Sequence, residues 1–589
     1  MGNDANPETI AADSLAYEAV QIAAELLADA NAQQTEAERS QAQKIARMMD
    51  DPEGKELTIA LIDQAFRSRR PARIADQLAY LLDRYGPPSY MDWWERVALV
   101  VGGLMGHYMP SLVVPPIMAR LRQETRYIIL PAEEDELRAY LTKRRQEGVR
   151  LNLNLLGEAI LGEGEAQRRL EGFLALLARD DVEYISVKIS AICSQLNQVA
   201  FEQTLMMVKE RLRLLYRQAL AHQYRHPDGR VTPKFINLDM EEYRDLRLTV
   251  AAFRDVLDEP EFAELSAGLA LQAYLPDSYQ IQQHLTAWAM NRRQRGGAPV
   301  KLRIVKGANL AMERVEASLR GWPQAPYTTK VETDANFKRM VAYGALPAHA
   351  QAVHLGIGSH NLFDIAYSLL LRRMHGMEQA IEFEMLEGMA NHQARALQAQ
   401  AGGLLLYAPV VKAEDFHSAI AYLVRRLDEN TAPENFLHDL FGLEPGSPAW
   451  NRQRDRFLEA VAQQNLVSDR PRRTQDRRIE KPEPAHGVPF ANEPDTDWSL
   501  PANCTWIHEV MERWQQHKPE QIPLQINGEE LYTEQSADGL DPSREASGRG
   551  GVAYRHALAD IALVDQALRA AVAAQPAWAA RGWQSDSGS

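Results

Sequence analysis

Two adjacent arginines and an acidic residue lie within one helical turn near the middle of the chain. Arg425 and Arg426 are followed by Glu429, and residues three or four positions apart share one face of a helix. Two guanidinium groups give paired, charge-assisted hydrogen bonds to a carboxylate. The turn follows the apolar run 404–407. Taken alone, the arginines fit a solvated helix face equally well, but their position predicts a site for a small anion beyond a barrel strand.

The elements that would position this turn alternate between short β-rich runs and longer amphipathic stretches. Eight such alternations over about 280 residues predict an α/β fold, a (βα)8 barrel. Chemistry in such barrels lies at the C-terminal ends of the strands, where this sequence places Lys188, Asp239, Gln272, Lys306 and Tyr407. The predicted strands are residues 151–155, 184–190, 235–239, 269–274, 300–306, 353–357, 381–385 and 403–407.

The composition excludes several classes of protein. A chain of 589 residues with 45% hydrophobic content can bury large cores and form more than one domain. A net charge of −15 argues against a nucleic-acid partner. Cys193 and Cys504 are too few for a cysteine-built metal cluster and fit a reducing cytoplasm. The polar N-terminus does not resemble a signal peptide. We expect a cytoplasmic protein without a metal site.

One uncharged segment needs a separate interpretation. Residues 97–119 contain no Asp, Glu, Lys or Arg, and these 23 residues could cross a bilayer. Pro110, Pro115 and Pro116 would interrupt such a helix. We therefore expect a buried helix followed by a turn.

The domain boundaries follow from these patterns. We expect a helical N-terminal region over 1–118, the barrel over 119–465, a linker over 466–500 and a further segment over 501–589. The stretch 468–493 is rich in Arg, Pro, Glu and Asp, which favours a solvated linker over a nucleic-acid patch. In the last segment, Asn527-Gly528 predicts a hairpin and residues 560–569 a helix.

With these residues in place, the chain resembles the proline dehydrogenase domain of the bacterial bifunctional proline utilization A flavoproteins. The resemblance covers roughly residues 120–440, and most of its pieces fall at predicted strand ends. The pieces are residues 155–158, 186–190, 237–242, 271–274, 302–308, 327–334, 359–361, 383–389, 407–410 and 422–430.

The resemblance implies a reaction and a substrate site. FAD would take a hydride from C5 of L-proline to give Δ1-pyrroline-5-carboxylate, the first step toward glutamate, and a membrane quinone would accept the electrons. Peripheral contact with the inner face of the membrane is then expected. Arg425 and Arg426 would clamp the proline carboxylate, and Tyr407 would pack against the substrate. Lys188 and Asp239 would lie beside it, with Lys188 paired to Asp239 or to Glu429.

The resemblance also implies an FAD site held by the barrel, and no G-x-G-x-x-G fingerprint follows a strand. Gln272 would meet the isoalloxazine edge, and Arg303 would approach the flavin N5. Thr329, Lys330 and Thr333 lie on the stretch that touches the phosphates and adenosine. The remaining expected cofactor contacts are Val305, Lys306, Gly307, Ala308, His360, Asn361, Glu384 and Glu429.

Two features depart from the family pattern. Asn309 and Leu310 stand where an aromatic pair is common, which changes the expected pocket wall. Residues 524–528, 541–543 and 564–583 resemble the first part of an aldehyde dehydrogenase domain. Its catalytic cysteine and nucleotide-binding segments are missing, so the NAD-dependent second step is predicted absent and the domain truncated.

Two other functions compete with the enzyme. A non-catalytic proline-binding module is disfavoured because Lys188, Asp239, Gln272, Arg303 and Tyr407 are all present. A proline-responsive transcriptional repressor is disfavoured by the acidic N-terminus and by the lack of a ribbon-helix-helix pattern. The oligomeric state is not indicated by the sequence.

Overall fold

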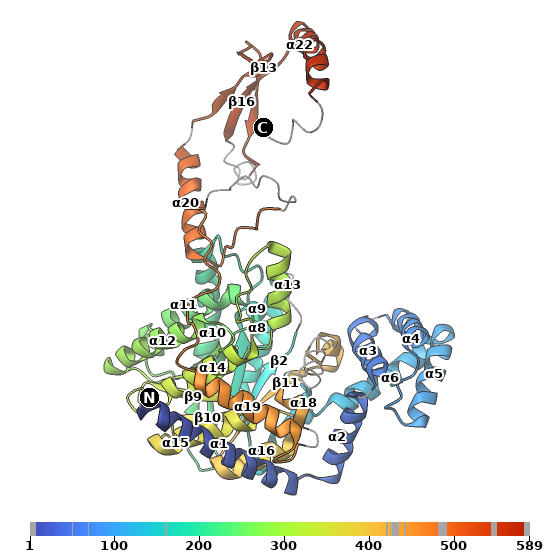
Figure 1. The fold of residues 1–589 in the computed structure, drawn as a ribbon, viewed down its shortest axis with the longest axis vertical. Coiled ribbons are helices and arrows are strands. Elements are labelled where there is room, and N and C mark those ends of the chain that lie inside the picture. The colour runs from blue at the N-terminus through green and yellow to red at the C-terminus, as the bar shows by residue number, and fades with distance from the viewer. Residues whose placement is uncertain are drawn as a thin grey trace, which may run out of the picture. The chain divides into compact units, whose positions relative to one another are not determined.

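The structure is a computed structural model that describes residues 7–49, 51–66, 68, 70–157, 160, 162–419, 422–423, 426, 435–440, 443–480, 492–516, 518–542 and 551–581. The chain forms two compact units, residues 1–503 and residues 504–589. The first unit contains a barrel and a set of N-terminal helices (Figure 1).

The barrel is a closed ring of eight parallel strands, in the order β2-β3-β6-β7-β8-β9-β10-β11 with β11 paired back to β2. All eight predicted strands are confirmed. They are β2 (Arg150–Leu155), β3 (Tyr184–Lys188), β6 (Phe235–Asp239), β7 (Gly268–Gln272), β8 (Val300–Val305), β9 (Val353–Gly358), β10 (Ile381–Leu386) and β11 (Leu405–Val411).

Helices surround the ring and bury its outer face (Figure 1). Successive side chains of a strand point to opposite faces, so Leu302 and Ile304 of β8 join the apolar core while Arg303 and Val305 line a cavity inside the ring. The helices are α7 (Glu134–Gln146), α8 (Glu163–Ala178), α9 (Ile189–Ile192), α10 (Phe201–Ala221), α11 (Leu246–Leu257), α12 (Asp277–Gln294), α13 (Leu310–Arg320), α14 (Lys330–Gly344), α15 (Leu362–His375), α16 (Asn391–Ala401), α18 (Phe436–Leu440) and α19 (Pro448–Gln463).

Short strands complete this unit. β1 (Leu130–Pro131) adds to the edge of β11, and β4 (Gln223–Arg225) pairs with β5 (Val231–Pro233) in a hairpin between α10 and β6.

The interior of the ring carries charged side chains that pair with one another. Lys301 contacts Glu382 and Glu384, each at 2.6 Å, and Glu384 also lies 3.6 Å from Arg303. A Cβ atom at Gly356 would lie 2.1 Å from Glu384 Oε1, so only glycine leaves room for this carboxylate. The small residue on β9 therefore permits an ion-paired interior.

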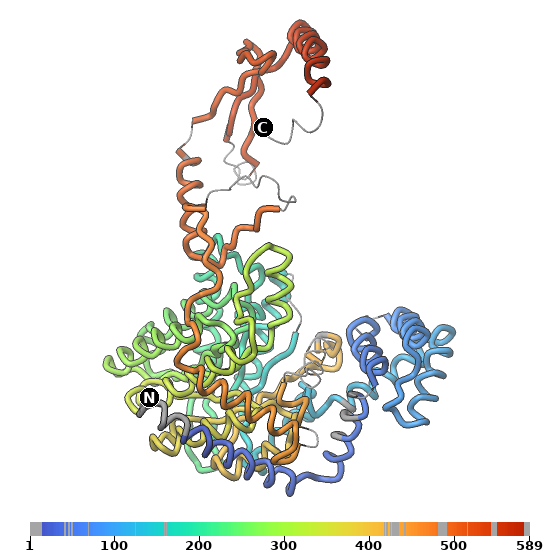
Figure 2. The backbone as a smooth tube through the Cα atoms, viewed as in Figure 1, coloured from blue at the N-terminus to red at the C-terminus, as the bar shows by residue number. Residues whose placement is uncertain are grey.

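The N-terminal region is helical, as predicted: α1 (Pro7–Ala32), α2 (Glu36–Met49), α3 (Pro52–Ala60), the π-helical turn η1 (Leu61–Ala65), α4 (Pro71–Tyr85), α5 (Trp93–Tyr108) and α6 (Pro110–Thr125). The tube in Figure 2 shows α1 running beside α15 and α16, with which it is in contact. α4, α5 and α6 pack against one another.

The expectation of a buried helix and a turn over 97–119 is wrong. The segment forms parts of two helices, and Pro115 and Pro116 lie inside α6. Leu104 is 68% exposed and Leu112 is 63% exposed. Within the described residues, no helix is long and apolar enough to cross a membrane.

The chain after α19 returns to the barrel before it reaches the second unit. Arg473, in the stretch predicted as a solvated linker, is 3% exposed. Its guanidinium lies 3.6 Å from Glu313 and 3.5 Å from Asp497, and it stacks on Tyr243 and Trp322. This part of the stretch is packed rather than solvated, because paired charges and aromatic rings accommodate the arginine.

The C-terminal unit is small. α20 (Pro501–Gln516) leads into β12 (Glu520–Ile522), β13 (Leu524–Ile526), β14 (Glu529–Leu531), β15 (Ser536–Leu540), β16 (Val552–Ala557) and α22 (Ile561–Ala579). The predicted hairpin is confirmed, since β13 and β14 pair antiparallel across Asn527 and Gly528, whose φ angles are 55° and 82°. The predicted helix is also present and extends to Ala579.

Candidate active site

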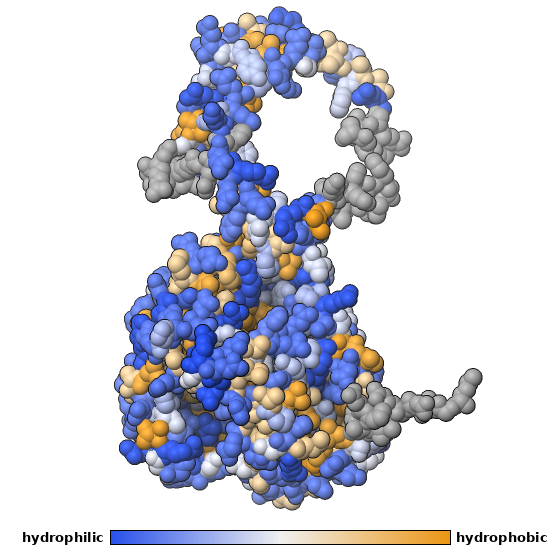
Figure 3. Space-filling model, turned by 90° about the vertical axis from the view of Figure 1, so that its left-hand side faces the viewer, coloured by the Kyte–Doolittle hydropathy of each residue, from blue (hydrophilic) through white to orange (hydrophobic). Residues whose placement is uncertain are grey.

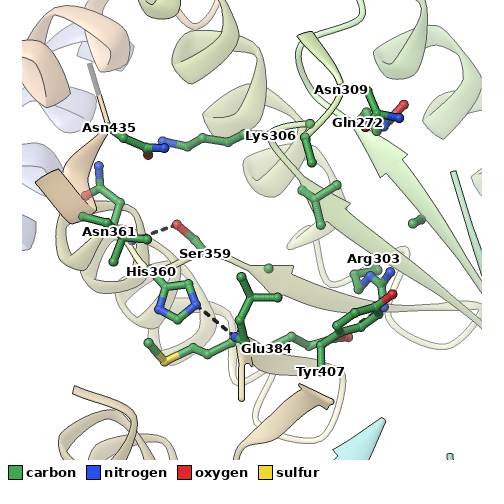
Figure 4. Close-up of a pocket in the computed structure, with 18 of the residues that line it drawn as sticks. Gln272, Arg303, Lys306, Asn309, Ser359, His360, Asn361, Glu384, Tyr407 and Asn435 are labelled. Atoms are coloured by element: carbon green, nitrogen blue, oxygen red, sulfur yellow. Dashed lines mark hydrogen bonds and ion pairs between the residues drawn. The ribbon is translucent and has the colours of Figure 1, made fainter. Parts of the chain in front are cut away.

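A cavity of about 320 Å³ opens at the C-terminal ends of the barrel strands. All eight strands of the ring contribute to its lining. In the close-up, Arg303 and Tyr407 lie together, while Lys306 extends toward Asn435 (Figure 4). The predicted site residues that line it are Lys188, Asp239, Gln272, Arg303, Val305, Lys306, Gly307, Ala308, Lys330, His360, Asn361, Glu384, Tyr407 and Arg426.

One part of the cavity is built around the buried carboxylate of Asp239. Arg303 of β8 donates to Asp239 Oδ1 through a short ion pair, and Asn237 donates to the same oxygen at 3.0 Å. The Tyr407 hydroxyl donates to Oδ2 at 2.9 Å, and the Arg303 guanidinium lies 5.3 Å from the Tyr407 ring centroid. Three strands thus fix an arginine and a tyrosine around one acid.

The electrostatics keep both partners of Asp239 in one protonation state. Burial and the Asp239 charge raise the pKa of Tyr407 well above its ordinary value, so the phenol stays neutral. Burial alone would lower the pKa of Arg303, but Asp239 and Glu384 raise it above its ordinary value. A neutral ring and a permanent cation therefore face the cavity together.

Lys188 does not pair with Asp239, contrary to one of the two partners expected. Its Nζ lies 2.7 Å from Glu241 Oε1, and both side chains remain about one-quarter exposed. Asp239 is already occupied by Arg303, which reaches it from β8. The other expected partner, Glu429, lies outside the described residues.

The loop after β6, residues 240–242, forms a wall of the cavity and is tied to the end of β7 and to the N-terminus of α13. Gln272 Nε2 donates to the Met240 carbonyl at 3.2 Å. Asn309 Nδ2 donates to the Glu241 carbonyl at 2.8 Å. Asn309, which stands where an aromatic was expected, is buried and lines the cavity. The amide therefore fastens this wall by a hydrogen bond.

A second part of the site is a partly buried cluster of three lysines and two carboxylates. Lys306 contacts Asp334 and Asp364, each at 2.6 Å. Lys330 donates to Asp334 through a short contact, and Lys338 donates to Asp364 at 2.9 Å. With all five groups ionised, the cluster has one excess positive charge, which suits an anion.

Burial and these neighbours set the charge of the cluster. Burial raises and the lysines lower the pKa of Asp334, with a net shift below its ordinary value. Burial would lower the pKa of Lys306, but Asp334 and Asp364 raise it above its ordinary value. Burial lowers the pKa of Lys330 to about 8, and the Lys306 charge acts in the same direction. Lys330 is thus the member whose charge changes near neutral pH.

His360 and Asn361 lie on the loop between β9 and α15. His360 Nε2 accepts a hydrogen bond from the Leu386 backbone N–H at 2.9 Å, which leaves the proton on Nδ1. That Nδ1 is buried and has no hydrogen-bond partner among the described residues. Burial and the Arg426 charge lower the pKa of His360 to about 3. The ring is therefore neutral and offers one buried donor at the cavity.

Asn361 also stabilises the N-terminus of α15. Its side-chain oxygen caps α15 by accepting from the Phe363 backbone N–H at 3.0 Å. Its amide group is then the part that is available to a ligand.

Gly307 lets the chain pass close to a buried ring. Its φ is 124°, and a Cβ atom there would lie 2.6 Å from the Tyr274 ring. Glycine is required on both grounds, and this turn carries Lys306, Gly307 and Ala308 along the cavity.

Of the two adjacent arginines, the structure describes only Arg426. Arg426 is 7% exposed, lines the cavity and lies 4.8 Å from the centroid of the Tyr422 ring. Arg425 and Glu429 lie outside the described residues, so their predicted roles stay predictions.

Thr329 and Thr333 do not line the cavity. Thr329 is the N-cap of α14, where its hydroxyl accepts from the Glu332 backbone N–H and the Glu332 carboxylate accepts from Thr329 N. This capping box explains a threonine at this position without a ligand.

Several lining residues were missed by the sequence reasoning. Asn154 is the residue before the last of β2, and Asp334 lies one helical turn after Lys330, so the position of each in the sequence could have marked it as a site residue. Gln453 and Arg456 come from α19, beyond the last strand. No strand end marks these two, and only the packing of α19 brings them to the cavity.

The chain was compared with known proteins. The family model described as proline dehydrogenase matches residues 137–439. A comparison with curated proteins gave no match.

Solved structures of proline utilization A (PutA) are similar over more of the chain. The protein from Corynebacterium freiburgense is 42% identical, with a TM-score of 0.58 over 69% of this chain and 38% of its own. The protein from Bdellovibrio bacteriovorus, inactivated by N-propargylglycine, is 26% identical, with a TM-score of 0.73 over 96% of this chain and 55% of its own. The chain thus spans between 38% and 55% of the length of these relatives.

The family match covers just over half of the chain and includes every strand of the ring. The match to the structure from Bdellovibrio bacteriovorus covers 96% of the chain, so it takes in the barrel and helices of the region that precedes it. The chain therefore belongs to the proline dehydrogenase family and carries a proline dehydrogenase domain of the PutA type.

Proposed function

We propose that the chain is an FAD-dependent proline dehydrogenase that oxidises L-proline to Δ1-pyrroline-5-carboxylate and passes the electrons to a quinone. This is the first step of proline degradation to glutamate. The observation that carries the proposal is the arrangement of Arg303, Asp239 and Tyr407 at the barrel mouth of a proline dehydrogenase family member. We assign the reaction to the barrel domain, residues 119–465.

The residues that line the cavity fit FAD. The lysine cluster has an excess positive charge that matches a pyrophosphate, and Gly307 and Ala308 allow its close approach. The Nδ1–H of His360, which has no partner in the part of the chain that the structure describes, is a buried donor that a polar cofactor would satisfy. When bound, FAD supplies the acceptor for the hydride. Lys306, Lys330 and His360 would hold it, with Gln272 and Asn361 offering amide groups.

Arg303 would act where charge develops. Its guanidinium is buried, remains charged and is held by Asp239 and Glu384. A preorganised cation in a site of low dielectric stabilises developing negative charge without reorganisation. Asp239 fixes the position of this cation, and Tyr407 fixes Asp239.

Proline would lie between Tyr407 and Arg426. Arg426, together with Arg425, would hold the carboxylate, and the neutral Tyr407 ring would form an apolar wall for the pyrrolidine. The cations Lys188 and Arg303 would lower the pKa of the proline amine, because like charges disfavour its protonated form. A neutral amine is required before hydride leaves C5.

Product formation tests the proposal. The purified protein, supplied with FAD, L-proline and a soluble dye acceptor, should form Δ1-pyrroline-5-carboxylate, measured as its coloured adduct with o-aminobenzaldehyde. Arg303→Met should form almost none. Proline binding in calorimetry without product from the FAD-loaded protein would instead support the non-catalytic binding module and overturn the enzyme.

A further inference from the structure

Helix α5 packs against α4 with its smallest residues. Gly103 and Gly106 are buried, and a Cβ atom at these positions would lie 2.7 Å from Leu82 and 3.2 Å from Ala75. Most surface helices bury their large apolar side chains and expose polar ones. In α5 the glycines occupy the inner face, so the large apolar residues are turned outward.

The outer face of α5 and the turn into α6 form one apolar surface, here termed the hairpin surface. Trp93 is 78% exposed and Tyr108 is 83% exposed. Large apolar residues exposed together in this way are unusual unless something covers them. The hairpin surface consists of Trp93, Trp94, Val97, Val100, Val101, Leu104, Met105, Tyr108, Met109 and Leu112.

Several features favour a lipid surface as the occupant. The stretch 97–119 has no Asp, Glu, Lys or Arg, and the exposed turn at Tyr108 and Met109 is apolar. Trp93 and Trp94 stand at one end of α5 and Tyr108 at the other. Such aromatic rings are preferred at the boundary between lipid and water.

The charge around the hairpin surface is opposite to that of the chain. Residues 84–126 contain five arginines and three acidic residues, a formal charge of +2, whereas the whole chain has −15. Local positive charge strengthens binding to anionic lipids. A protein partner would not require this stretch to be positively charged in an acidic chain.

Helices α5 and α6 form a helical hairpin, and the inner face of α6 is connected to the barrel mouth. Val114 of α6 belongs to an apolar cluster that also contains Phe416 and Tyr422. Tyr422 lines the active-site cavity. The hairpin is therefore a neighbour of the reaction site through one continuous cluster.

We propose that the hairpin surface is the site at which this chain lies on an anionic membrane, with α5 in the plane of the interface. The role rests on the proposed function, since a quinone acceptor is dissolved in lipid. Spanning is not involved, because the described helices include none that could cross a membrane.

Flotation with vesicles tests this surface without substrate or cofactor. The full chain should float with vesicles of phosphatidylcholine and phosphatidylglycerol, and the Trp emission should shift to shorter wavelength. A double variant, Val101→Glu with Leu104→Glu, should lower the bound fraction at least about tenfold, because two charges would enter the interface. Met206→Glu, at a 59% exposed site on α10, is the matched control and should bind as the parent does.

The outcomes separate this proposal from the proposed reaction. Activity with a soluble dye should be equal in the parent and the double variant, while reduction of a quinone held in vesicles should be lost only in the variant. Absence of the parent from the vesicle fraction overturns the membrane site whatever the activity. Equal flotation of parent and double variant also overturns it, as does self-association through this surface without lipid binding.

Discussion

The interior of the barrel and the hairpin surface both invert the usual distribution of side chains. Inside the ring, Arg303, Asp239 and Lys301 are charged and buried. On α5, Leu104 and Tyr108 are apolar and exposed. By contrast, the face in Figure 3 is mostly hydrophilic, with apolar side chains in scattered groups.

The difference between the two regions lies in where the compensation comes from. Buried charges inside the ring pair with an opposite charge two strands away: Arg303 of β8 pairs with Asp239 of β6, and Lys301 of β8 pairs with Glu384 of β10. In α5, Gly103 and Gly106 pack against α4, while the large apolar residues are exposed. The buried charges of the barrel are thus neutralised by other residues of the same chain. The exposed apolar residues of α5 would instead be covered by the proposed membrane.

Removing one buried partner should have the largest effect. Arg303→Met leaves the Asp239 carboxylate without its cation, and we expect proline oxidation to fall by about 10²–10³-fold. The free energy of unfolding should fall by about 3–5 kcal/mol, because a buried charge loses its partner. Steady-state assays and urea unfolding measure the two effects.

The control for this prediction is Arg213→Met. Arg213 of α10 pairs at 2.8 Å with Glu259, in the turn after α11, and such a partly exposed pair should contribute only about 1 kcal/mol or less. Adding Asp239→Asn to Arg303→Met should recover stability but not activity. Additive destabilisation in this double variant would contradict internal compensation.

The next largest effect should be on the affinity for proline. Arg426→Met removes a buried guanidinium at the cavity, and the KM for proline should rise by roughly 30–100-fold, as expected for lost charge-assisted hydrogen bonds. FAD absorbance per protein should stay the same. An unchanged KM would remove Arg426 from the substrate site.

The lysine cluster gives a smaller effect on cofactor affinity. Lys306→Met removes the excess charge but leaves Lys330 with Asp334 and Lys338 with Asp364. Titration of the apoprotein with FAD should show an affinity about 10-fold weaker, from the loss of one charged contact. Lys209→Met, which breaks an outer ion pair with Asp255, should leave it unchanged. Equal affinities in the two variants would exclude an anion at the cluster.

The smallest effect concerns His360. Its folded pKa of about 3 lies below the ordinary 6.5, so the unfolded chain binds the proton first as pH falls. The contribution of His360 to stability is therefore complete above about pH 6.5 and is lost toward pH 3. Relative to His360→Gln, the parent should lose roughly 0.8 kcal/mol of unfolding free energy between pH 7.5 and pH 6. Parallel stability curves would contradict a buried neutral imidazole.

The barrel could be predicted from sequence because each strand repeats one local signal. An apolar run with a polar residue at its end marks β3, β6 and β8, and the position of that residue follows from the parallel topology. The hairpin at Asn527-Gly528 was likewise fixed by local turn chemistry.

Pairing and burial were harder to predict because they depend on distant residues. Lys188 was expected near Asp239, its neighbour in register, but Arg303 reaches Asp239 from β8 and Lys188 turns to Glu241. Residues 97–119 were expected to be buried because they are apolar. Instead, the glycines of α5 determine which face of the helix packs against α4. The apolar composition of the segment alone does not indicate which face is buried.

Anaerobic titration with proline can show whether the barrel mouth oxidises proline on a bound flavin. The purified protein, reconstituted with FAD, is mixed with L-proline while the visible spectrum is recorded. We expect the flavin absorbance near 450 nm to decrease with a saturable dependence on proline, because the hydride acceptor is reduced. A flavin-loaded protein whose spectrum does not change with L-proline would contradict it.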